Sequence, residues 1–580
     1  MLPDLRAIEK TFDYVVPDKL RDHVRVGSLV RIDLNGRRVG GWVVAVDVVP
    51  PAGVDLKPIA RFSSAGPSRE ILDLAEWAAW RWAGRPQHFL TTASPPTVVP
   101  GLAPPRARRR PVVRTQAEPI SVAGGVLAAI ERGDRLVVAR VAPAGSVEAV
   151  VAAVATMGPT IVALPSIAAA RTVANALERA GLLVARYPRQ WAVAASGAAD
   201  VVVGSRMAVW ATMPDLAAIV VVDEHDEAHQ SESSPTWHAR DVAVERARRD
   251  GAWCVLTSPC PSLEALDLDN AVVVAPSRSD ERAGWPIVEL VDRGDEDPRT
   301  RTSLVSSALA RALASGQRVV CVHNTKGVAR LLACASCQSI ARCEVCDAAV
   351  SQQEAGLVCA RCGATRPVVC LVCGASRMKA LRPGVSRLRG ELEAATGESV
   401  VEVTAATAGA PLPPARVYVG TEAALHQVRE ADVVAFLDID AELLAPRFRA
   451  GEQVMALLAR AARLVGGRAG DGRLVVQTSL PGHPVLQAAV LADPSRIVTG
   501  ERETREALRL PPVTALASLS GAGSEELVAA LAVVAGIEVQ GPSDSRWLLR
   551  ARSHRLLCDA FAAVGRPAER VRIEVDPLRV

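Results

Sequence analysis

The sequence has no apolar run of the length that a membrane span requires. Its most apolar stretch, residues 147–164, is interrupted by Glu148 and by Gly158-Pro159, whereas a spanning helix needs about 20 consecutive apolar residues. The first ten residues, MLPDLRAIEK, lack the basic and then apolar order of a secretory signal. We therefore expect no membrane partner and a cytoplasmic location.

Lysine is also scarce, because only five of the 67 basic residues are lysine. The excess of arginine, together with much alanine and valine, is typical of a GC-rich genome and indicates no function. The net charge of +4 is too small to indicate a nucleic-acid partner by itself. Arginines at positions 106 and 108–110 make residues 101–118 a basic, proline-rich linker, which either contacts phosphates or is simply solvated.

Cysteine is infrequent overall, but eight of the twelve cysteines lie within forty residues as four Cys-x-x-Cys pairs. Each pair supplies two thiolates, and a structural zinc ion takes four. The gap of five residues between the first and second pairs is tight for one shared metal, whereas twelve residues between the second and third pairs are typical of a zinc ribbon. We therefore predict two Zn²⁺ sites, an inner one at Cys343, Cys346, Cys359 and Cys362 and an outer one at Cys334, Cys337, Cys370 and Cys373. A disulfide framework and redox chemistry are the alternatives, and neither suits a chain without an export signal.

The 580 residues are enough for three to five domains, and 49% hydrophobic residues predict packed cores. Residues 1–100 combine alternating, strand-like segments with an Asn35-Gly36 hairpin signal and one closing helix, which predicts a small β-rich domain. Short apolar strands then alternate with alanine-rich helices in two successive blocks, a pattern typical of parallel sheets covered by helices. We predict an α/β protein with lobes at 119–290 and 297–480, a cysteine-rich insertion at 331–378 in the second lobe, and an α+β domain at 481–580.

Several motifs together resemble one known family, primosomal protein N′, the replication restart protein PriA. The cysteine array is inserted after Val322-His-Asn-Thr-Lys-Gly-Val, where the family has a similar insertion. The stretches Val201-Val-Val-Gly-Ser-Arg and Asp223-Glu-His-Asp are similar to two further family motifs. The other matches are Trp237-His-Ala-Arg, Leu437-Asp-Ile-Asp, Phe448-Arg-Ala-Gly-Glu, and Glu501-Arg-Glu-Thr-Arg followed by Pro511-Pro512.

The resemblance, which covers nearly the whole chain, implies two RecA-like helicase lobes behind a domain that binds a 3′ DNA end. In that domain it assigns DNA contacts to Phe12, Asp13, Gly36 and Lys57, with Asn35 aligning nearly as well as Gly36. Phe12 can stack on a base, Asp13 can accept from a base edge or the 3′-hydroxyl, and Lys57 can meet a phosphate. Residue type alone favours Phe12 as a core residue and Asp13 as a turn residue, and the resemblance favours the DNA contacts instead.

The same resemblance implies partners and a role. The partners are branched or fork DNA, other primosome proteins, single-strand-binding protein, and the replicative helicase or its loader. The role is to recognise stalled or branched forks in the nucleoid and to promote reloading of the replicative helicase. The zinc module would be a rigid docking surface in this role.

The family's phosphate loop, G-x-x-x-x-G-K-[ST], is altered in this sequence. Aligned on Gly145, the lysine is replaced by Ser146 and the hydroxyl residue by Val147, and Pro143 lies within the loop. Proline removes an amide donor, and valine cannot bind magnesium. We therefore predict no nucleotide site at Gly145, Ser146 and Val147, no catalytic residue, and a protein that is not an enzyme.

The remaining motor residues then need another role. We interpret Asp223, Glu224, Arg460 and Arg463 as capping or ion-paired residues. The family's winged-helix domain is also missing, because only about fifteen residues separate the DNA-end domain from the first lobe.

Two other functions stay open at this point. An active ATP-dependent 3′–5′ DNA helicase of the primosome would hydrolyse ATP in a DNA-dependent way. A zinc-ribbon protein acting on RNA or transcription complexes would bind 3′-recessed DNA no worse after substitution of Phe12 and Lys57.

Overall fold

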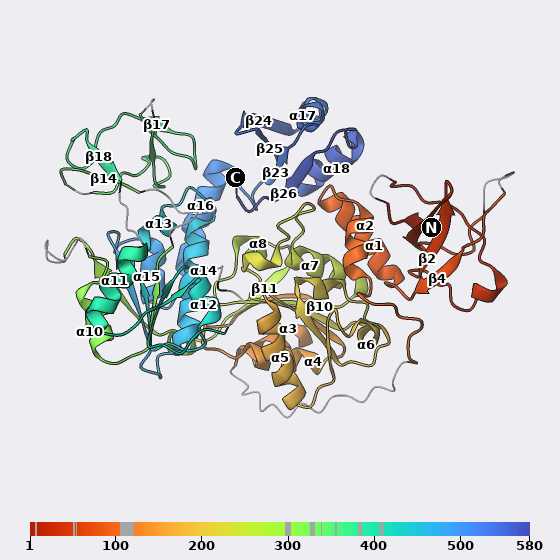
Figure 1. Cartoon of the computed structure of the whole chain (residues 1–580), viewed down its shortest axis with the longest axis horizontal. Coiled ribbons are helices and arrows are strands. Elements are labelled where there is room, and N and C mark those ends of the chain that lie inside the picture. Colours follow the sequence, from red (N-terminus) through yellow and green to blue (C-terminus); the bar gives the residue numbers. More distant parts are fainter. Residues whose placement is uncertain are drawn as a thin grey trace.

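The computed structural model describes the chain except for residues 6–7, 50–52, 54, 105–120, 296–302, 325–330, 338, 354–355, 381–384, 405–406, 408–410 and 580. The basic linker arginines at 106 and 108–110 therefore lie outside the described residues. The elements fall into five parts along the chain (Figure 1). None of the helices that the described residues form combines the length and the apolar character that crossing a bilayer requires.

The first part is a four-stranded antiparallel sheet with two helices behind it. The strands pair in the order β1-β3-β2-β4, and Asn35 and Gly36 form the turn between β2 and β3. Both residues have a positive φ, 50° and 74°, which suits asparagine and glycine in a tight hairpin. The elements are β1 (Leu2–Pro3), η1 (Asp18–Leu20), β2 (Leu29–Leu34), β3 (Arg37–Trp42), β4 (Arg61–Ser64), α1 (Arg69–Arg81) and α2 (Pro86–Ala93).

Lobe 1 is a seven-stranded parallel sheet in the order β11-β5-β10-β9-β6-β8-β7. Its strands are β5 (Leu136–Arg140), β6 (Thr160–Leu164), β7 (Val184–Arg186), β8 (Val201–Ser205), β9 (Ala218–Val222), β10 (Trp253–Ser258) and β11 (Ala271–Val274). Its helices are α3 (Val122–Glu131), α4 (Val147–Ala155), α5 (Ile167–Arg179), α6 (Trp191–Ala195), α7 (Ala239–Asp250), α8 (Leu263–Leu266) and α9 (Arg278–Ala283); short 3₁₀ turns are η2 (Arg206–Trp210) and η3 (Glu227–His229).

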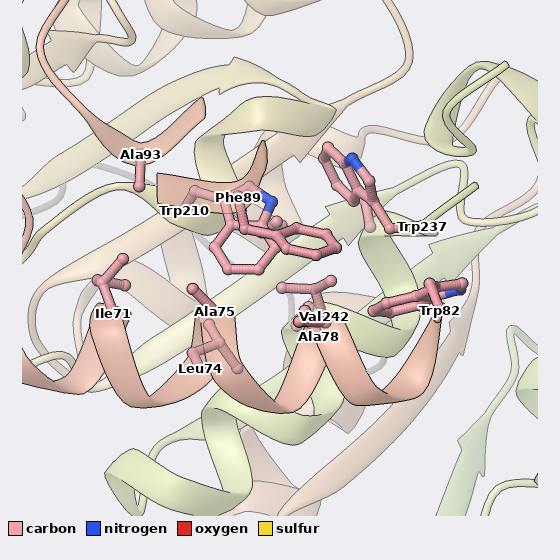
Figure 2. Close-up of a cluster of buried hydrophobic side chains, with 14 of the residues drawn as sticks. Ile71, Leu74, Ala75, Ala78, Trp82, Phe89, Ala93, Trp210, Trp237 and Val242 are labelled. Carbon is pink, nitrogen blue, oxygen red and sulfur yellow. The ribbon is translucent and has the colours of Figure 1, made fainter. Parts of the chain in front are cut away.

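The two faces of this sheet bury alternate side chains of the same strands, as the period of two requires. One face packs on α3, α4 and α5, and the other packs on α7 and on α1 and α2 of the first part. Figure 2 shows this second core, in which Trp82 and Phe89 meet Trp210, Trp237 and Val242 of lobe 1. The N-terminal helices are therefore held against lobe 1 by a shared aromatic core.

Lobe 2 is a six-stranded parallel sheet in the order β12-β22-β21-β13-β20-β19. Its strands are β12 (Ile287–Asp292), β13 (Val319–Val322), β19 (Val401–Val403), β20 (Val417–Gly420), β21 (Val433–Phe436) and β22 (Arg473–Thr478). Its helices are α10 (Ser307–Ala314), α11 (Val385–Thr396), α12 (Ala423–Gln427), α13 (Asp440–Leu443), α14 (Ala450–Val465) and α15 (Pro484–Val490). The α/β class with two parallel-sheet lobes is confirmed.

The cysteine-rich part and the C-terminal part complete the molecule. The cysteine-rich strands are β14 (Leu332–Cys334), β15 (Ser351–Gln353), β16 (Gly356–Val358), β17 (Thr365–Arg366) and β18 (Met378–Ala380), and β14 pairs with β18. The turn η5 (Pro494–Ile497) and α16 (Val498–Leu508) lead from lobe 2 to an antiparallel sheet in the order β24-β25-β23-β26. Its elements are β23 (Ala515–Ser520), α17 (Ser524–Ala532), β24 (Ile537–Ser543), β25 (Arg546–Ala551), α18 (His554–Val564) and β26 (Arg572–Val575).

Candidate functional site

A cavity of about 740 Å³ lies between the two lobes. Lobe 1 contributes the residues that follow β9, from Glu224 to Ala228, and lobe 2 contributes residues of α12 and α14. The carboxyl ends of parallel strands meet at this edge, which is where open α/β sheets place their ligand sites. Several charged side chains in and beside the cavity are paired across it.

Asp223, directly after β9, is bound by an arginine of the other lobe. Its carboxylate accepts hydrogen bonds of 2.7 and 2.9 Å from the two terminal nitrogens of Arg463 in α14. Burial alone would raise the pKa of Asp223, but the Arg463 guanidinium holds it well below its ordinary value. The pair therefore joins an ionised carboxylate of lobe 1 to lobe 2.

A second ion pair lies further along the same two segments. Arg460 donates to Asp226 at 2.6 Å and also bonds to Glu422, which precedes α12. Gln453 of α14 donates to Glu227. Helix α14 thus presents a polar side to the acidic segment of lobe 1, and the two arginines expected to be ion-paired lie in this contact.

Glu224 differs from its neighbours because its partners all belong to lobe 1. Its side chain is fully buried and accepts from the Ser262 amide at 2.8 Å, the Ser262 hydroxyl at 2.8 Å and Arg240 at 3.2 Å. Burial opposes the charge of Arg240, but Asp241 and Glu224 raise its pKa. No local sequence pattern indicated that Arg240 and Ser262 would hold this carboxylate.

In the altered phosphate loop, backbone amides and the Ser146 hydroxyl form hydrogen bonds with neighbouring protein groups. The Ala144 amide donates to the Gly284 carbonyl at 3.1 Å and the Gly145 amide to the Ala142 carbonyl at 2.7 Å. Ser146 caps α4, because its hydroxyl accepts from the Ala149 amide at 3.1 Å. Val147 is the first residue of that helix.

The eight cysteine thiols of the Cys-x-x-Cys pairs gather in two groups of four. One group is Cys334, Cys337, Cys370 and Cys373, and the other is Cys343, Cys346, Cys359 and Cys362. Within each group all four sulfur atoms lie within 4.8 Å of one another. Neighbouring sulfurs in these groups lie 3.5 to 3.6 Å apart. Zn–S bonds of about 2.3 Å in a tetrahedron place sulfurs about 3.8 Å apart, so both groups fit a metal ion of this size.

The turns around these thiols also suit anionic sulfur. The amides of Ser336, Val345 and Val372 each donate to the sulfur two residues earlier, at 3.4 Å. Such bonds stabilise a thiolate over a neutral thiol. The Ala349 amide then joins this part to lobe 2 through the Leu444 carbonyl at 2.8 Å.

Two of the four residues assigned to a DNA end, Gly36 and Lys57, contact Asp33 near the end of β2. The Lys57 ammonium lies 3.3 Å from one Asp33 oxygen, and the Gly36 amide donates to the same oxygen at 3.2 Å. The segment that carries Phe12 and Asp13 is fixed beside them, because the next residue, Tyr14, donates its hydroxyl to the Asp33 carbonyl at 3.0 Å. Sequence reasoning missed Asp33, although its place two residues before the Asn-Gly turn puts it at the hairpin end.

Phe12 is the fourth of these residues, and it is only partly buried. Its ring carries the Lys10 ammonium 5.2 Å from its centre, and its backbone pairs with Met1 in both directions. The ring is therefore partly exposed and has a cation over it. This is the arrangement that base stacking beside a phosphate requires.

Two parallel-sheet lobes with acids and arginines paired between them form the two-lobe, RecA-like arrangement that the resemblance implies. Residues 2–95 match the family described as the 3′DNA-binding domain (3′BD) of PriA. The "Probable replication restart protein PriA" of Mycobacterium tuberculosis is 29% identical over 89% of this chain and 85% of its own length. The "Replication restart protein PriA" of Bacillus subtilis is 27% identical over 58% of this chain and 44% of its own length. Over most of its length the chain is therefore similar to replication restart proteins PriA, and its first 95 residues match their 3′DNA-binding domain.

Among solved structures, Dbp5 of Saccharomyces cerevisiae bound to RNA and ADP BeF3 is 12% identical. That match covers 67% of this chain and 94% of Dbp5, with a TM-score of 0.38.

The prediction that the chain is not an enzyme is wrong. The relatives that cover most of its length are replication restart proteins PriA, and this similarity points to an enzyme of the helicase type. The prediction inferred the loss of all activity at the interlobe cavity from three altered residues of the phosphate loop. The acids and arginines of the cleft are present and face one another.

Proposed function

We propose that this chain is a replication restart protein that recognises stalled or branched fork DNA through a 3′ end and promotes reloading of the replicative helicase. The observation that carries the proposal is the match of residues 2–95 to the PriA 3′DNA-binding domain, together with the cluster of Gly36, Lys57 and the Phe12 segment around Asp33. The cluster offers a ring face, a carboxylate and a cation, which are the groups that hold a terminal nucleotide.

Equilibrium binding of fork DNA tests the proposal. Wild type and the variants Phe12→Ala and Lys57→Ala are titrated against forks that end at the junction in a 3′-hydroxyl or a 3′-phosphate. We expect each variant to lose about 1–3 kcal/mol of binding free energy for the hydroxyl end. Lys19→Ala, which removes an exposed lysine of η1, is the matched control and should bind as wild type does. Equal binding by all variants would support the zinc-ribbon RNA alternative.

We also propose that each group of four cysteines holds one Zn²⁺ as a structural ion. The sulfur spacing supports this choice, and so do the backbone amides that donate to sulfur in three of the four Cys-x-x-Cys turns. Sites closed by four thiolates, with no free coordination position, are typical of structural zinc. Metal analysis should find two zinc ions per chain. Cys343→Ser should lose one of them, whereas Cys558→Ala, at a buried cysteine of α18, should lose none.

We infer from the similarity to PriA that the chain hydrolyses ATP in a DNA-dependent way at the interlobe cavity. Asp223 and Glu224 after β9, and Arg460 and Arg463 across the cleft, support this location. A steady-state ATPase assay with fork DNA tests it. Glu224→Gln keeps the shape and should abolish the activity, and the absence of hydrolysis in wild type would contradict the proposal.

The protein partners of the proposed role are other primosome proteins, single-strand-binding protein, and the replicative helicase or its loader. The support for them is the similarity to replication restart proteins PriA. Pull-down with purified single-strand-binding protein and replicative helicase, in the presence of fork DNA, tests each one. The proposed setting is the bacterial nucleoid.

A further inference from the structure

Two sequence motifs have no role assigned above, although Arg449 and Glu452 of the first one line the interlobe cavity. Phe448-Arg-Ala-Gly-Glu forms the start of α14 in lobe 2, and Glu501-Arg-Glu-Thr-Arg lies in α16, which leads to the C-terminal sheet. The structure brings these motifs together, about fifty residues apart in the chain, and joins them to α8 of lobe 1 (Figure 1). The contact is therefore a junction of three parts of the molecule.

Arg505 is the residue that touches all three parts. Its side chain is fully buried and donates to Glu264 of α8 at 3.0 Å. It also bonds to Glu452 of α14, and it donates to the Pro511 carbonyl, in the segment before β23, at 3.1 Å. The planar guanidinium can serve several acceptors at fixed angles, which a lysine ammonium on a flexible stem cannot do.

The two acids bound by Arg505 also link the lobes directly. Glu452 of lobe 2 accepts from the Leu263 amide of lobe 1 at 2.9 Å. Glu264 of lobe 1 accepts from Arg449 of lobe 2 at 2.6 Å. Each lobe therefore holds the other through one carboxylate, and Arg505 binds both carboxylates at once.

The aromatic residue and the glycine of the first motif, Phe448 and Gly451, both pack against neighbours in this junction. The Phe448 ring lies 5.0 Å from the Arg449 guanidinium and 5.4 Å from that of Arg505. A side chain on Gly451 would place its Cβ 2.0 Å from a carboxylate oxygen of Glu501. The glycine lets α16 approach α14 closely enough for Arg505 to reach Glu452.

The junction is largely buried, so each of its charged side chains is stabilised by its oppositely charged partners rather than by water. Removing one partner of a buried ion pair leaves an uncompensated charge, which is strongly destabilising. A change in the angle between the lobes moves Glu264 relative to Glu452. Arg505 cannot follow both acids, because its own backbone is fixed to α16.

We propose that Arg505 is a positioning residue that couples opening of the two lobes to movement of the C-terminal domain. Relative motion of two lobes about an interface is the usual conformational step of such folds. Here it requires either that Arg505 releases one acid or that α16 moves with the lobes. The inference does not rest on the proposed DNA recognition, because it concerns only contacts within the chain.

Hydrogen exchange of the full-length, metal-loaded protein tests the coupling. The amide of Leu263 reports directly on the lobe contact, since it donates to Glu452. In Arg505→Gln we expect about tenfold faster exchange in peptides that cover α8 and the start of α14, with exchange in β9 unchanged. Arg505→Lys keeps the charge and should show an intermediate acceleration.

Arg502→Gln is the matched control for position. Arg502 lies one turn earlier in α16 and pairs with Asp267 of lobe 1, but 40% of its side chain is exposed. In Arg502→Gln we expect hydrogen exchange in the peptides that cover α8 and the start of α14 to stay at the wild-type rate. Equal rates in wild type and Arg505→Gln, or equal acceleration in both glutamine variants, would overturn the proposal.

A second pair of variants keeps the test valid if Arg505→Gln does not fold. Glu452→Gln preserves the shape and removes one charge, and it should accelerate exchange at α8 in the same way. A double-mutant cycle of Arg505→Lys with Asp576→Asn then measures coupling to the C-terminal domain, because Asp576 ties that domain to lobe 1 elsewhere. Strictly additive effects on α8 exchange would show that Arg505 holds the lobes without the C-terminal domain and would overturn the coupling.

Discussion

At the scale of single residues, the pair between Asp223 and Arg463 links the two lobes directly. The Asp223 side chain is 9% exposed, whereas that of Arg463 is 42% exposed. Solvent therefore screens the arginine and reduces the net contribution of the pair. Breaking the pair costs free energy mainly at the carboxylate, because Asp223 stays buried without a counter-charge.

Arg463→Ala should lower the free energy of unfolding by about 1–2 kcal/mol at pH 7, since it leaves Asp223 buried without its cation. The lowered pKa of Asp223 sets the pH dependence. Its contribution is present above the ordinary aspartate pKa of about 4 and is lost as pH falls below it. Denaturant unfolding between pH 3 and pH 8 checks both statements. The variant should differ from wild type above pH 5 and converge with it in acid; a constant difference would contradict the ion-pair account.

Glu501 should show the opposite pH dependence. Burial, and after it Glu452, raises its pKa to about 7, so the folded protein holds a proton that the unfolded chain releases above about 4.3. The cost of ionising Glu501 therefore grows as pH rises from about 4.3 to 7 and stays constant above.

Glu501→Gln should accordingly gain about 1–2 kcal/mol of stability on wild type between pH 5 and pH 8. Thermal unfolding at the two pH values measures the difference. Glu503→Gln, at an exposed residue of the same helix, is the control and should show no such trend. A gain of equal size at both pH values would mean that Glu501 is already ionised at pH 5.

The sequence predicted residues well where chemistry demands a spacing. The gap lengths indicated which Cys-x-x-Cys pairs would meet, because a knuckle fixes two thiolates and a metal needs four. Asp33 and Arg505 could not be found in this way. The sequence places Asp33 beside a hairpin turn and Arg505 in a motif, but each acts through partners that the fold brings from other elements, so neither role could be predicted.

At the scale of elements, the parallel strands were predictable because each is a short, fully apolar run between helices. The order of the strands was not, since it depends on which helices cover which face. Glycines show this dependence clearly. Gly420 ends β20 beside β19, and a Cβ there would lie 1.8 Å from the Val403 carbonyl oxygen, although nothing in the local sequence marks it.

Gly420→Ala should therefore destabilise lobe 2 by about 1–3 kcal/mol, because the clash is with backbone that cannot rotate away. Gly390→Ala is a matched control in the exposed part of α11, where nothing lies within 4 Å of the new Cβ. It should stabilise by about 0.5–1 kcal/mol through helix propensity. Denaturant unfolding of both variants checks the opposite signs. A neutral Gly420→Ala would show that β19 can move away from β20.

At the scale of the whole molecule, the C-terminal domain closes the chain back on its beginning. The Ile573 and Val575 carbonyls of β26 accept from Ser234 and Thr236 of lobe 1. Helix α18 packs near α1 of the first part, and Trp80 donates to Asp559 across that contact at 2.9 Å. The sequence predicted the parts in order along the chain, but it could not predict that the last would pack on the first, because such contacts leave no periodic signal.

Asp576 is the residue at which these parts meet. Its carboxylate lies 2.7 Å from Arg81 of α1 and 2.7 Å from His554 of α18, and its carbonyl accepts from Gln230 of lobe 1 at 2.6 Å. Burial opposes ionisation, but His554 and Arg81 lower the pKa of Asp576. The Arg81 side chain is only 9% exposed, so its charge depends on this aspartate.

Asp576→Asn keeps the positive φ of 53°, which asparagine tolerates, and removes only the charge. We expect a loss of about 2–3 kcal/mol at pH 7 that disappears as pH falls below about 4, where the wild-type carboxylate also loses its advantage. Hydrogen exchange should rise together in α1 and α18, since Arg81 and His554 lose the same partner. Asp559→Asn, at an exposed aspartate of α18 that also contacts α1, should leave exchange in α1 within about twofold of wild type. If α18 alone became faster in Asp576→Asn, the aspartate would serve only its own domain, and the N-terminal helices would be held to the C-terminal domain by their apolar core.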